Sequence, residues 1–186
     1  MSDMSRRKFL LSSLAGLGAA AVTRAGLGGD LGYTFGTHDE AVREAWRLVE
    51  EDGAARAIVK GCEVVSVERG RGVGPLIRLL VSSPQLLKGA TIVDSVAGRA
   101  VAAVAAKGGA KEVLARTASE GAKEVLAASG IPLEAKVMVA HIMNRDLTGT
   151  CPIEAATEGL DSPDEIVAAA KRKLDELRQS AREATV

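Results

Sequence analysis

Aromatic residues are scarce in this chain of 186 residues, with only Phe9, Tyr33, Phe35 and Trp46 present. After Trp46 there is no ring on which a base, a sugar or a flavin could stack. A basic excess is also lacking, because 24 Lys and Arg residues balance 24 Asp and Glu residues. Binding through phosphate neutralisation depends on such an excess. The composition therefore argues against a nucleic-acid partner.

A membrane-spanning run is absent near the N-terminus, although an apolar stretch is present there. The stretch from Leu10 to Val22 has 13 residues and includes glycines and serines, whereas a spanning helix needs about 20 apolar residues. Arg6 and Arg7 directly precede it, which is typical of a twin-arginine export signal. We expect residues 1–25 to be a signal peptide, cleaved after Ala21 or Ala25. The mature protein would be periplasmic or extracellular and would meet the membrane only through this signal.

Cysteine is nearly absent as well. Cys62 and Cys151 lie 89 positions apart, and we expect two free thiols. Residues 26–36 contain five glycines and are predicted to be a flexible linker. The remainder, residues 37–186, has the size and apolar content of a single domain.

A helix and a hairpin are predicted at the start of this domain. Thr37 and Glu40 have the spacing of a capping box, which predicts a helix that ends at Gly53. Residues 57–59 and 64–67 are β-rich runs on either side of a Gly-Cys pair, as in a tight hairpin. Pro75 then indicates the start of a short helix over residues 76–81.

Strands and helices alternate from residue 90 onward. Predicted strands cover residues 90–93, 112–115 and 137–139; predicted helices cover residues 95–107, the segment from a capping box at Thr117 to Gly130, and residues 163–183 after Ser162. Such βαβαβ alternation indicates parallel strands with right-handed crossovers. Together with the hairpin it predicts a three-layer α/β fold with a mixed sheet of about five strands.

Polar residues that follow the predicted strands form the candidate site. Ligands of open α/β sheets bind at the carboxyl ends of strands, so we expect one site that contains Asp94, Arg99, Ser119, Asn144, Arg145, Cys151 and Glu154. Ordinary structural roles remain open for four of them. Asp94 has the position of a helix N-cap and Arg145 that of a surface ion-pair member, while Cys151 fits a buried apolar residue and Glu154 a first-turn acid.

Three ordered motifs resemble a known bacterial family. They are Gly-Val-Gly-Pro-Leu at residues 72–76, Asp-Ser-Val-Ala-Gly-Arg-Ala at residues 94–100, and Asn144-Arg145 followed by Cys-Pro-Ile-Glu at residues 151–154. Over about residues 54–164 the chain resembles the family called domain of unknown function eighteen ninety-three. Ser95 and Arg99 stand where that family more usually has lysines. The resemblance implies the cytidine-deaminase-like structural class, with a hairpin, a parallel βαβαβ unit and helices on both faces.

The deaminase reaction itself is not expected. A zinc deaminase needs His or Cys ligands, a Cys-x-x-Cys pair and a glutamate. The corresponding positions look to be Val96, Gly98, Ser119 and Ala122, whose side chains do not bind zinc. Neither do His38, His141 and the two cysteines offer two ligands at short spacing. We therefore predict no metal site.

Two functions remain open at this point. In the first, a non-zinc site binds a small anionic ligand through Arg99, Ser119, Asn144 and Arg145, and Cys151 is a nucleophile or redox thiol beside Glu154 and Asp94. In the second, the domain is a catalytically inactive interaction module, and the stripe from Ile166 to Ala181 binds another protein or a second copy of the chain. The sequence identifies no cofactor and does not decide whether the protein is an enzyme.

Overall fold

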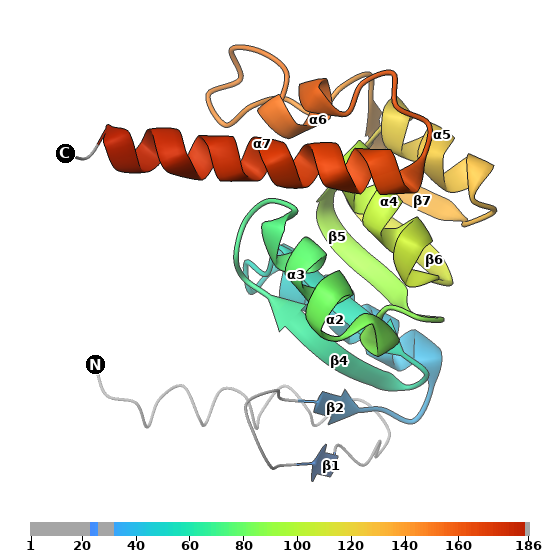
Figure 1. Cartoon of the computed structure of the whole chain (residues 1–186). Helices are drawn as coiled ribbons and strands as arrows, with labels where there is room; N and C mark the ends of the chain where they lie inside the picture. The colour runs from blue at the N-terminus through green and yellow to red at the C-terminus, as the bar shows by residue number, and fades with distance from the viewer. Residues whose placement is uncertain (1–22, 26–31, 185–186) are drawn as a thin grey trace.

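The computed structural model describes residues 23–25 and 32–184, which form an α/β fold (Figure 1). The strands are β1 (Thr23–Ala25), β2 (Gly32–Thr34), β3 (Arg56–Lys60), β4 (Glu63–Glu68), β5 (Thr91–Ala97), β6 (Glu112–Ser119) and β7 (Leu133–Val139). The helices are α2 (His38–Glu50), α3 (Gly74–Ser82), α4 (Arg99–Gly108), α5 (Glu120–Ala128), α6 (Pro152–Ala156) and α7 (Pro163–Glu183), and a 3-10 turn, η1, spans Pro84–Leu86. No helix in this described part is both long and apolar enough to cross a membrane.

All strands belong to one mixed sheet with the order β1-β2-β4-β3-β5-β6-β7. β3 and β4 form the predicted antiparallel hairpin, and β5, β6 and β7 are parallel as predicted. The two parts join where β3 pairs antiparallel with β5.

The sheet is larger than the five strands expected from the sequence. β2 pairs with β4, so β2 to β7 make six strands, and the three-residue β1 adds an edge strand. Residues 32–34 are therefore part of the sheet, although they lie in the segment predicted to be a flexible linker. The high glycine content predicted a linker here. The pairing is instead stabilised by backbone hydrogen bonds between β2 and the free edge of the hairpin strand β4. Residues 1–22 of the predicted signal peptide lie outside the described residues.

Helices cover both faces of the sheet, as predicted. On one face α2 packs against Ala57, Val59 and Val93, whereas Ile58 and Ile92 point to the opposite face. This alternation follows from the two-residue period of a strand. On the opposite face α4 and α5 cover the parallel strands, and α7 lies across α4 (Figure 1).

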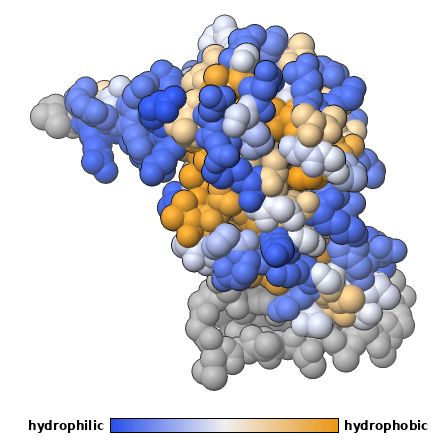
Figure 2. Space-filling model, turned by 45° about the vertical axis from the view of Figure 1, so that its right-hand side comes forward, coloured by the Kyte–Doolittle hydropathy of each residue, from blue (hydrophilic) through white to orange (hydrophobic). Residues whose placement is uncertain are grey.

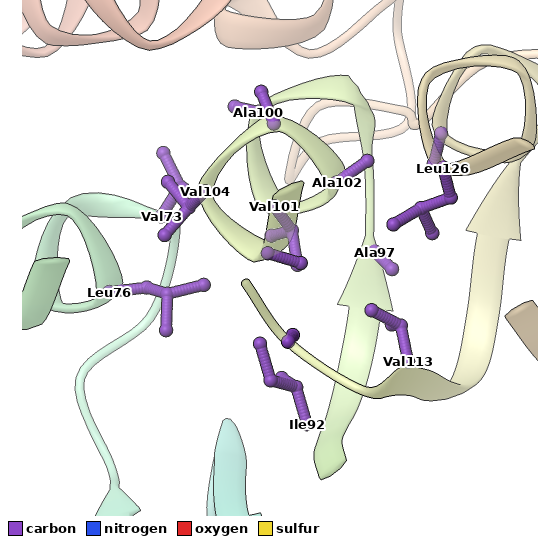
Figure 3. Close-up of a cluster of buried hydrophobic side chains, with 14 of the residues drawn as sticks. Val73, Leu76, Ile92, Ala97, Ala100, Val101, Ala102, Val104, Val113 and Leu126 are labelled. Atoms are coloured by element: carbon purple, nitrogen blue, oxygen red, sulfur yellow. The ribbon is translucent and has the colours of Figure 1, made fainter. Parts of the chain in front are cut away.

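The central helix α4 is alanine-rich because it is buried on almost every side. Every residue from Arg99 to Ala105 is buried, and the surrounding apolar side chains come from the sheet, α3 and α5 (Figure 3). Small side chains let these elements approach α4 closely without leaving voids. Among them Leu76, Ile92 and Leu126 are fully buried, so aromatic side chains are not needed to fill this core.

Two predicted helix starts are wrong because sheet pairing continues further than expected. β5 extends to Ala97, which pairs with Ala118 of β6, so α4 begins at Arg99 instead of Ser95. Likewise β6 includes Thr117, and Ser119 caps α5. Tertiary pairing here overrides the local capping patterns. The Ser162 side chain also forms no cap hydrogen bond, whereas the capping box at Thr37 is confirmed.

Candidate ligand site

A cavity of about 580 Å³ opens beside the carboxyl-terminal half of β5. Its walls come from the end of α2 and the turn after it, from residues 69–73, from β5 and the start of α4, and from residues 142–154. Four predicted site residues line it together, namely Asp94, Arg145, Cys151 and Glu154. The cavity thus has the position that open α/β sheets commonly use for ligands.

Asp94 contributes a buried carboxylate that is fully engaged within the protein. Its Oδ2 accepts a hydrogen bond of 2.8 Å from Nε of Arg56, and its Oδ1 accepts one of 2.9 Å from the backbone N–H of Val96. Arg56 also donates to Glu68 and to the carbonyl of Gly72, at 2.9 Å each. Asp94 therefore lies within β5 as an ion-pair member, and the alternative of a helix N-cap is wrong.

The Arg56 cluster shifts the pKa values of two of its members. Burial alone lowers the pKa of Arg56, but the charges of Asp94 and Glu68 more than offset this, so the pKa is raised. Burial raises the pKa of Glu68, and the neighbouring Arg56 offsets this only in part. Arg56 therefore stays charged beneath the cavity.

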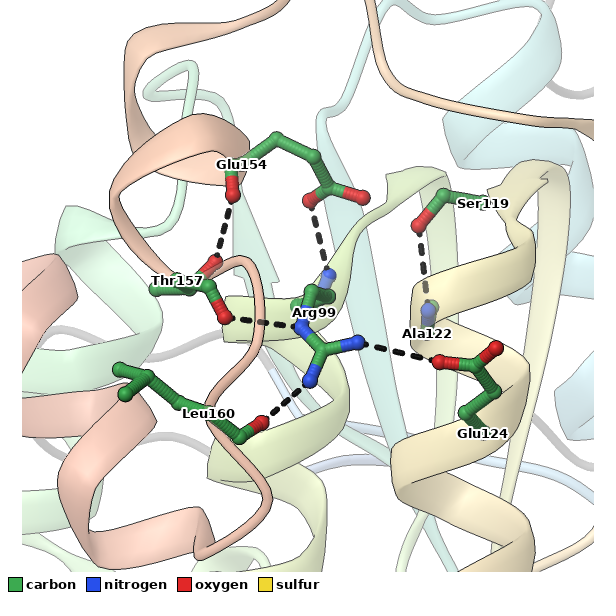
Figure 4. Close-up of polar contacts among 7 residues, drawn as sticks. All are labelled: Arg99, Ser119, Ala122, Glu124, Glu154, Thr157 and Leu160. Atoms are coloured by element: carbon green, nitrogen blue, oxygen red, sulfur yellow. Dashed lines mark hydrogen bonds and ion pairs between the residues drawn. The ribbon is translucent and has the colours of Figure 1, made fainter.

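Glu154 reaches from α6 to the start of α4 (Figure 4). Its Oε2 accepts a hydrogen bond of 3.0 Å from the backbone N–H of Arg99, which satisfies an unpaired donor at the first turn of α4. Gly98 permits this approach, because a Cβ atom there would lie 2.4 Å from Oε2. Glu154 is thus a buried cap for a helix distant in sequence, in addition to lining the cavity.

Arg99 does not present its guanidinium to the cavity, contrary to the predicted ligand-binding role. Its Nε donates to the carbonyl of Thr157 at 2.9 Å, Nη1 to Glu124 at 3.2 Å, and Nη2 to the carbonyl of Leu160 (Figure 4). The stem crosses Gly121, where a Cβ atom would lie 2.7 Å from Cγ. Arg99 lines only a smaller cavity of about 260 Å³, and it fastens the segment between α6 and α7 to α4 and α5.

Two other predicted ligand residues also have structural roles. Ser119 is fully buried and accepts a hydrogen bond of 3.1 Å from the backbone N–H of Ala122. Asn144 closes its own loop, because its Oδ1 accepts from the backbone N–H of Thr148 at 2.9 Å and its Nδ2 donates to Oγ1 of Thr148 at 3.0 Å. Neither residue lines the larger cavity.

Cys151 lies in the cavity wall next to apolar neighbours. It is half-buried at the N-terminal end of α6, and its backbone N–H donates to the carbonyl of Ile142 at 2.7 Å. Ile142 and Ile153 line the same wall. Both cysteines of the chain are free, as expected from their separation.

Besides the buried Arg56, four exposed arginines line the cavity, and the sequence pattern predicted only Arg145. Arg69, Arg71 and Arg116 line it too, and all four are exposed. Arg69 donates to the carbonyl of Asp52 at 2.7 Å. The other three form no ion pair within residues 32–184. Arg69 and Arg71 come from the exit of the hairpin and Arg116 from β6, so no sequence motif connected them with Arg145.

The sequence resemblance implies that four positions correspond to the zinc ligands and the glutamate of a zinc deaminase, and they lie around the starts of α4 and α5. Val96 is an exposed residue of β5, Gly98 is the N-cap of α4, and Ser119 and Ala122 form the cap of α5. No cluster of three His, Cys, Asp or Glu residues within the described part of the chain has a metal-binding arrangement.

Comparison with known proteins places the chain in a family. The family model described as "Domain of unknown function (DUF1893)" matches residues 44–174. The crystal structure of a DUF1893 family protein from Thermotoga maritima is similar, with a TM-score of 0.65 and 20% sequence identity over 72% of this chain and 90% of that chain. No curated protein matches. This chain belongs to the DUF1893 family.

Proposed function

We propose that the protein binds a small anionic molecule in the cavity beside β5. The observation that carries this proposal is the set of exposed arginines on its wall, of which Arg71, Arg116 and Arg145 form no ion pair in the described structure. Converging positive charges without partners raise the electrostatic free energy of the empty site, and an anion relieves it. Guanidinium groups match phosphate and carboxylate oxygens through paired hydrogen bonds.

Two of the three acidic residues of the cavity are paired with a basic residue and the third makes a helix cap, so the four exposed arginines remain in excess. Asp94 pairs with Arg56, Glu154 caps α4, and Glu50 pairs with Lys136 of β7. The remaining wall is partly apolar, with Val73, Val101 and other aliphatic side chains. We therefore expect a ligand with an anionic group at the arginines and an organic part against the aliphatic wall.

Ligand-dependent stabilisation of the fold tests this proposal. We expect inorganic phosphate or pyrophosphate to raise the unfolding temperature more than chloride of equal ionic strength, because a ligand of the native state stabilises it. Arg145→Ala should weaken this binding by roughly 10- to 100-fold, the cost of one charged hydrogen bond. Its unliganded stability should change by less than about 0.5 kcal/mol, because the side chain is exposed.

The matched control is Arg172→Ala, which removes the same charge from an exposed position of α7. If this variant loses ligand stabilisation to the same extent, the effect is non-specific and the proposal fails. A wild-type protein that no phosphate species stabilises contradicts the proposal directly.

Cys151 gives a second and independent readout of the same cavity. Bound ligand should slow the reaction of Cys151 with a maleimide, while Cys62, at the hairpin turn, reacts at an unchanged rate. The pH dependence of the Cys151 reaction also tests a thiol-dependent activity, which requires a thiolate at neutral pH. A thiol that reacts only above about pH 8.5 would leave binding as the function of this site.

The alternative of an inactive interaction module receives less support. Ile166 and Ala170 of the predicted partner stripe are fully buried in the core of the chain itself. Only the far end of the stripe projects, where Leu177 is 41% exposed, and this end of α7 is largely hydrophilic (Figure 2).

The cytidine-deaminase-like class and export by the twin-arginine route are part of the proposal. The class is supported by the hairpin next to three parallel strands and by the contact of Arg99 with Gly121, which brings the starts of α4 and α5 together. Export is supported by Arg6 and Arg7 ahead of a short apolar run.

A further inference from the structure

Strand β7 forms one edge of the sheet and pairs only with β6 among the described strands. It has seven residues, and its Val137 and Met138 are 50% and 38% exposed. Unpaired edge strands present free backbone N–H and C=O groups to other chains. Charged residues can protect such an edge, and this strand carries one of each sign, Glu134 and Lys136.

The pairing with β6 determines which backbone groups of β7 are free. The carbonyl of Pro132 accepts a hydrogen bond of 3.0 Å from the N–H of Val113 and so points toward β6. Backbone groups alternate in direction along a strand. The N–H and C=O groups of Leu133, Ala135, Val137 and Val139 therefore point outward.

We propose that two copies of this chain associate through antiparallel pairing of their β7 strands, centred on Ala135. In this register Ala135 faces its own equivalent, and Leu133 faces Val137 of the second copy, so the outward backbone groups of these three residues are paired. Glu134 then faces Lys136 of the second copy, and the same ion pair forms twice by symmetry. Both side chains lie on the α2 face of the strand, where Lys136 already contacts Glu50 and the ring of Trp46.

Charge selects this register over its neighbours. In an antiparallel pair, two facing residues either both point their backbone groups toward the other strand or both point them away. Two identical strands related by a two-fold axis can therefore be centred only on a residue, and not between two residues. Centres at Glu134 or Lys136 place like charges directly opposite, which is unfavourable. Centres at Val137 or Met138 pair neither charge with an opposite one. Only the centre at Ala135 forms two ion pairs and also places Val137 against an apolar residue.

Sedimentation of the full chain over a range of concentrations tests the proposal. We expect a dimer, and we expect Glu134→Lys or Lys136→Glu alone to raise its dissociation constant about tenfold or more, because each places like charges opposite. The double variant, Glu134→Lys with Lys136→Glu, should restore the dimer. A mixture of the two single variants should form a heterodimer, because one strand then carries two positive charges and the other two negative charges.

Ala135→Pro provides a test that does not depend on charge. It removes an outward N–H group and leaves the hydrogen bonds to β6 intact, so the variant should be folded by circular dichroism and monomeric. A monomeric wild-type protein overturns the proposal. So does a dimer that the single charge variants leave unchanged, since association must then use another surface, such as Val81 of α3, which is 77% exposed.

Discussion

Arg56 shows how a charge is retained in the core of this fold. It is 2% exposed, and its three guanidinium nitrogens donate to Asp94, Glu68 and the carbonyl of Gly72. A buried ion pair of this kind adds little stability compared with apolar packing, but losing one partner leaves an unpaired charge. The cluster thereby fixes the hairpin, β5 and residue 72 around the floor of the cavity.

Replacement of Arg56 should therefore destabilise the protein strongly. We expect Arg56→Met to lower the free energy of unfolding in urea by about 3–5 kcal/mol, because Asp94 remains buried without a counter-charge. The double variant with Asp94→Asn should lose less than the sum of the two single variants. Additive losses would show that the two side chains are not coupled as their contact implies.

At the scale of elements, Arg99 links segments that are far apart in sequence. It belongs to α4, yet it donates to carbonyls of the connection between α6 and α7 and to Glu124 of α5. Two of these acceptors are the backbone carbonyls of Thr157 and Leu160. Backbone carbonyls need a hydrogen-bond donor where they are shielded from water. The position of α6, which carries Glu154 into the cavity wall, thus depends on Arg99.

Loss of this guanidinium should release the connection before α7. We expect Arg99→Met to lower the free energy of unfolding by roughly 2–4 kcal/mol, from the loss of charged hydrogen bonds to the carbonyls of Thr157, which is buried, and Leu160, which is half-buried. Amide hydrogen exchange should become faster in α6 and in residues 157–160. Glu124→Gln is the control, because Glu124 is 72% exposed and its ion pair contributes little. Unchanged exchange in Arg99→Met would mean that α6 is held by other contacts.

The elements were more predictable than the site. The β-rich runs and the capping box at Thr37 identified the hairpin, the parallel strands and α2, because these depend on local periodicity. The ends of β5 and β6 depend on pairing across the sheet, so local patterns misplaced the starts of α4 and α5. Asp94 and Glu154 meet in one cavity as parallel topology implies. The roles of Arg99 and Arg116 depend on which neighbours surround each side chain, and sequence spacing does not contain that information.

At the scale of the whole molecule, the proposed export signal leads to a prediction about where the domain operates. If the twin-arginine route exports the chain, replacing Arg6 and Arg7 with lysine should retain the folded protein in the cytoplasm, because that route depends on the arginine pair. The lysines preserve the positive charge, so a general secretory route, which needs only charge and an apolar run, would continue to operate. Immunodetection in separated cell fractions measures the result.

The control for this experiment is Arg43→Lys with Arg172→Lys, which makes the same chemical change at two exposed positions of the domain. This control should be exported like the wild-type protein, because neither residue lies in the signal. Export of the Arg6→Lys, Arg7→Lys variant at the wild-type level would exclude the twin-arginine route. Retention of both variants would instead show that the domain, and not the arginine pair, limits export.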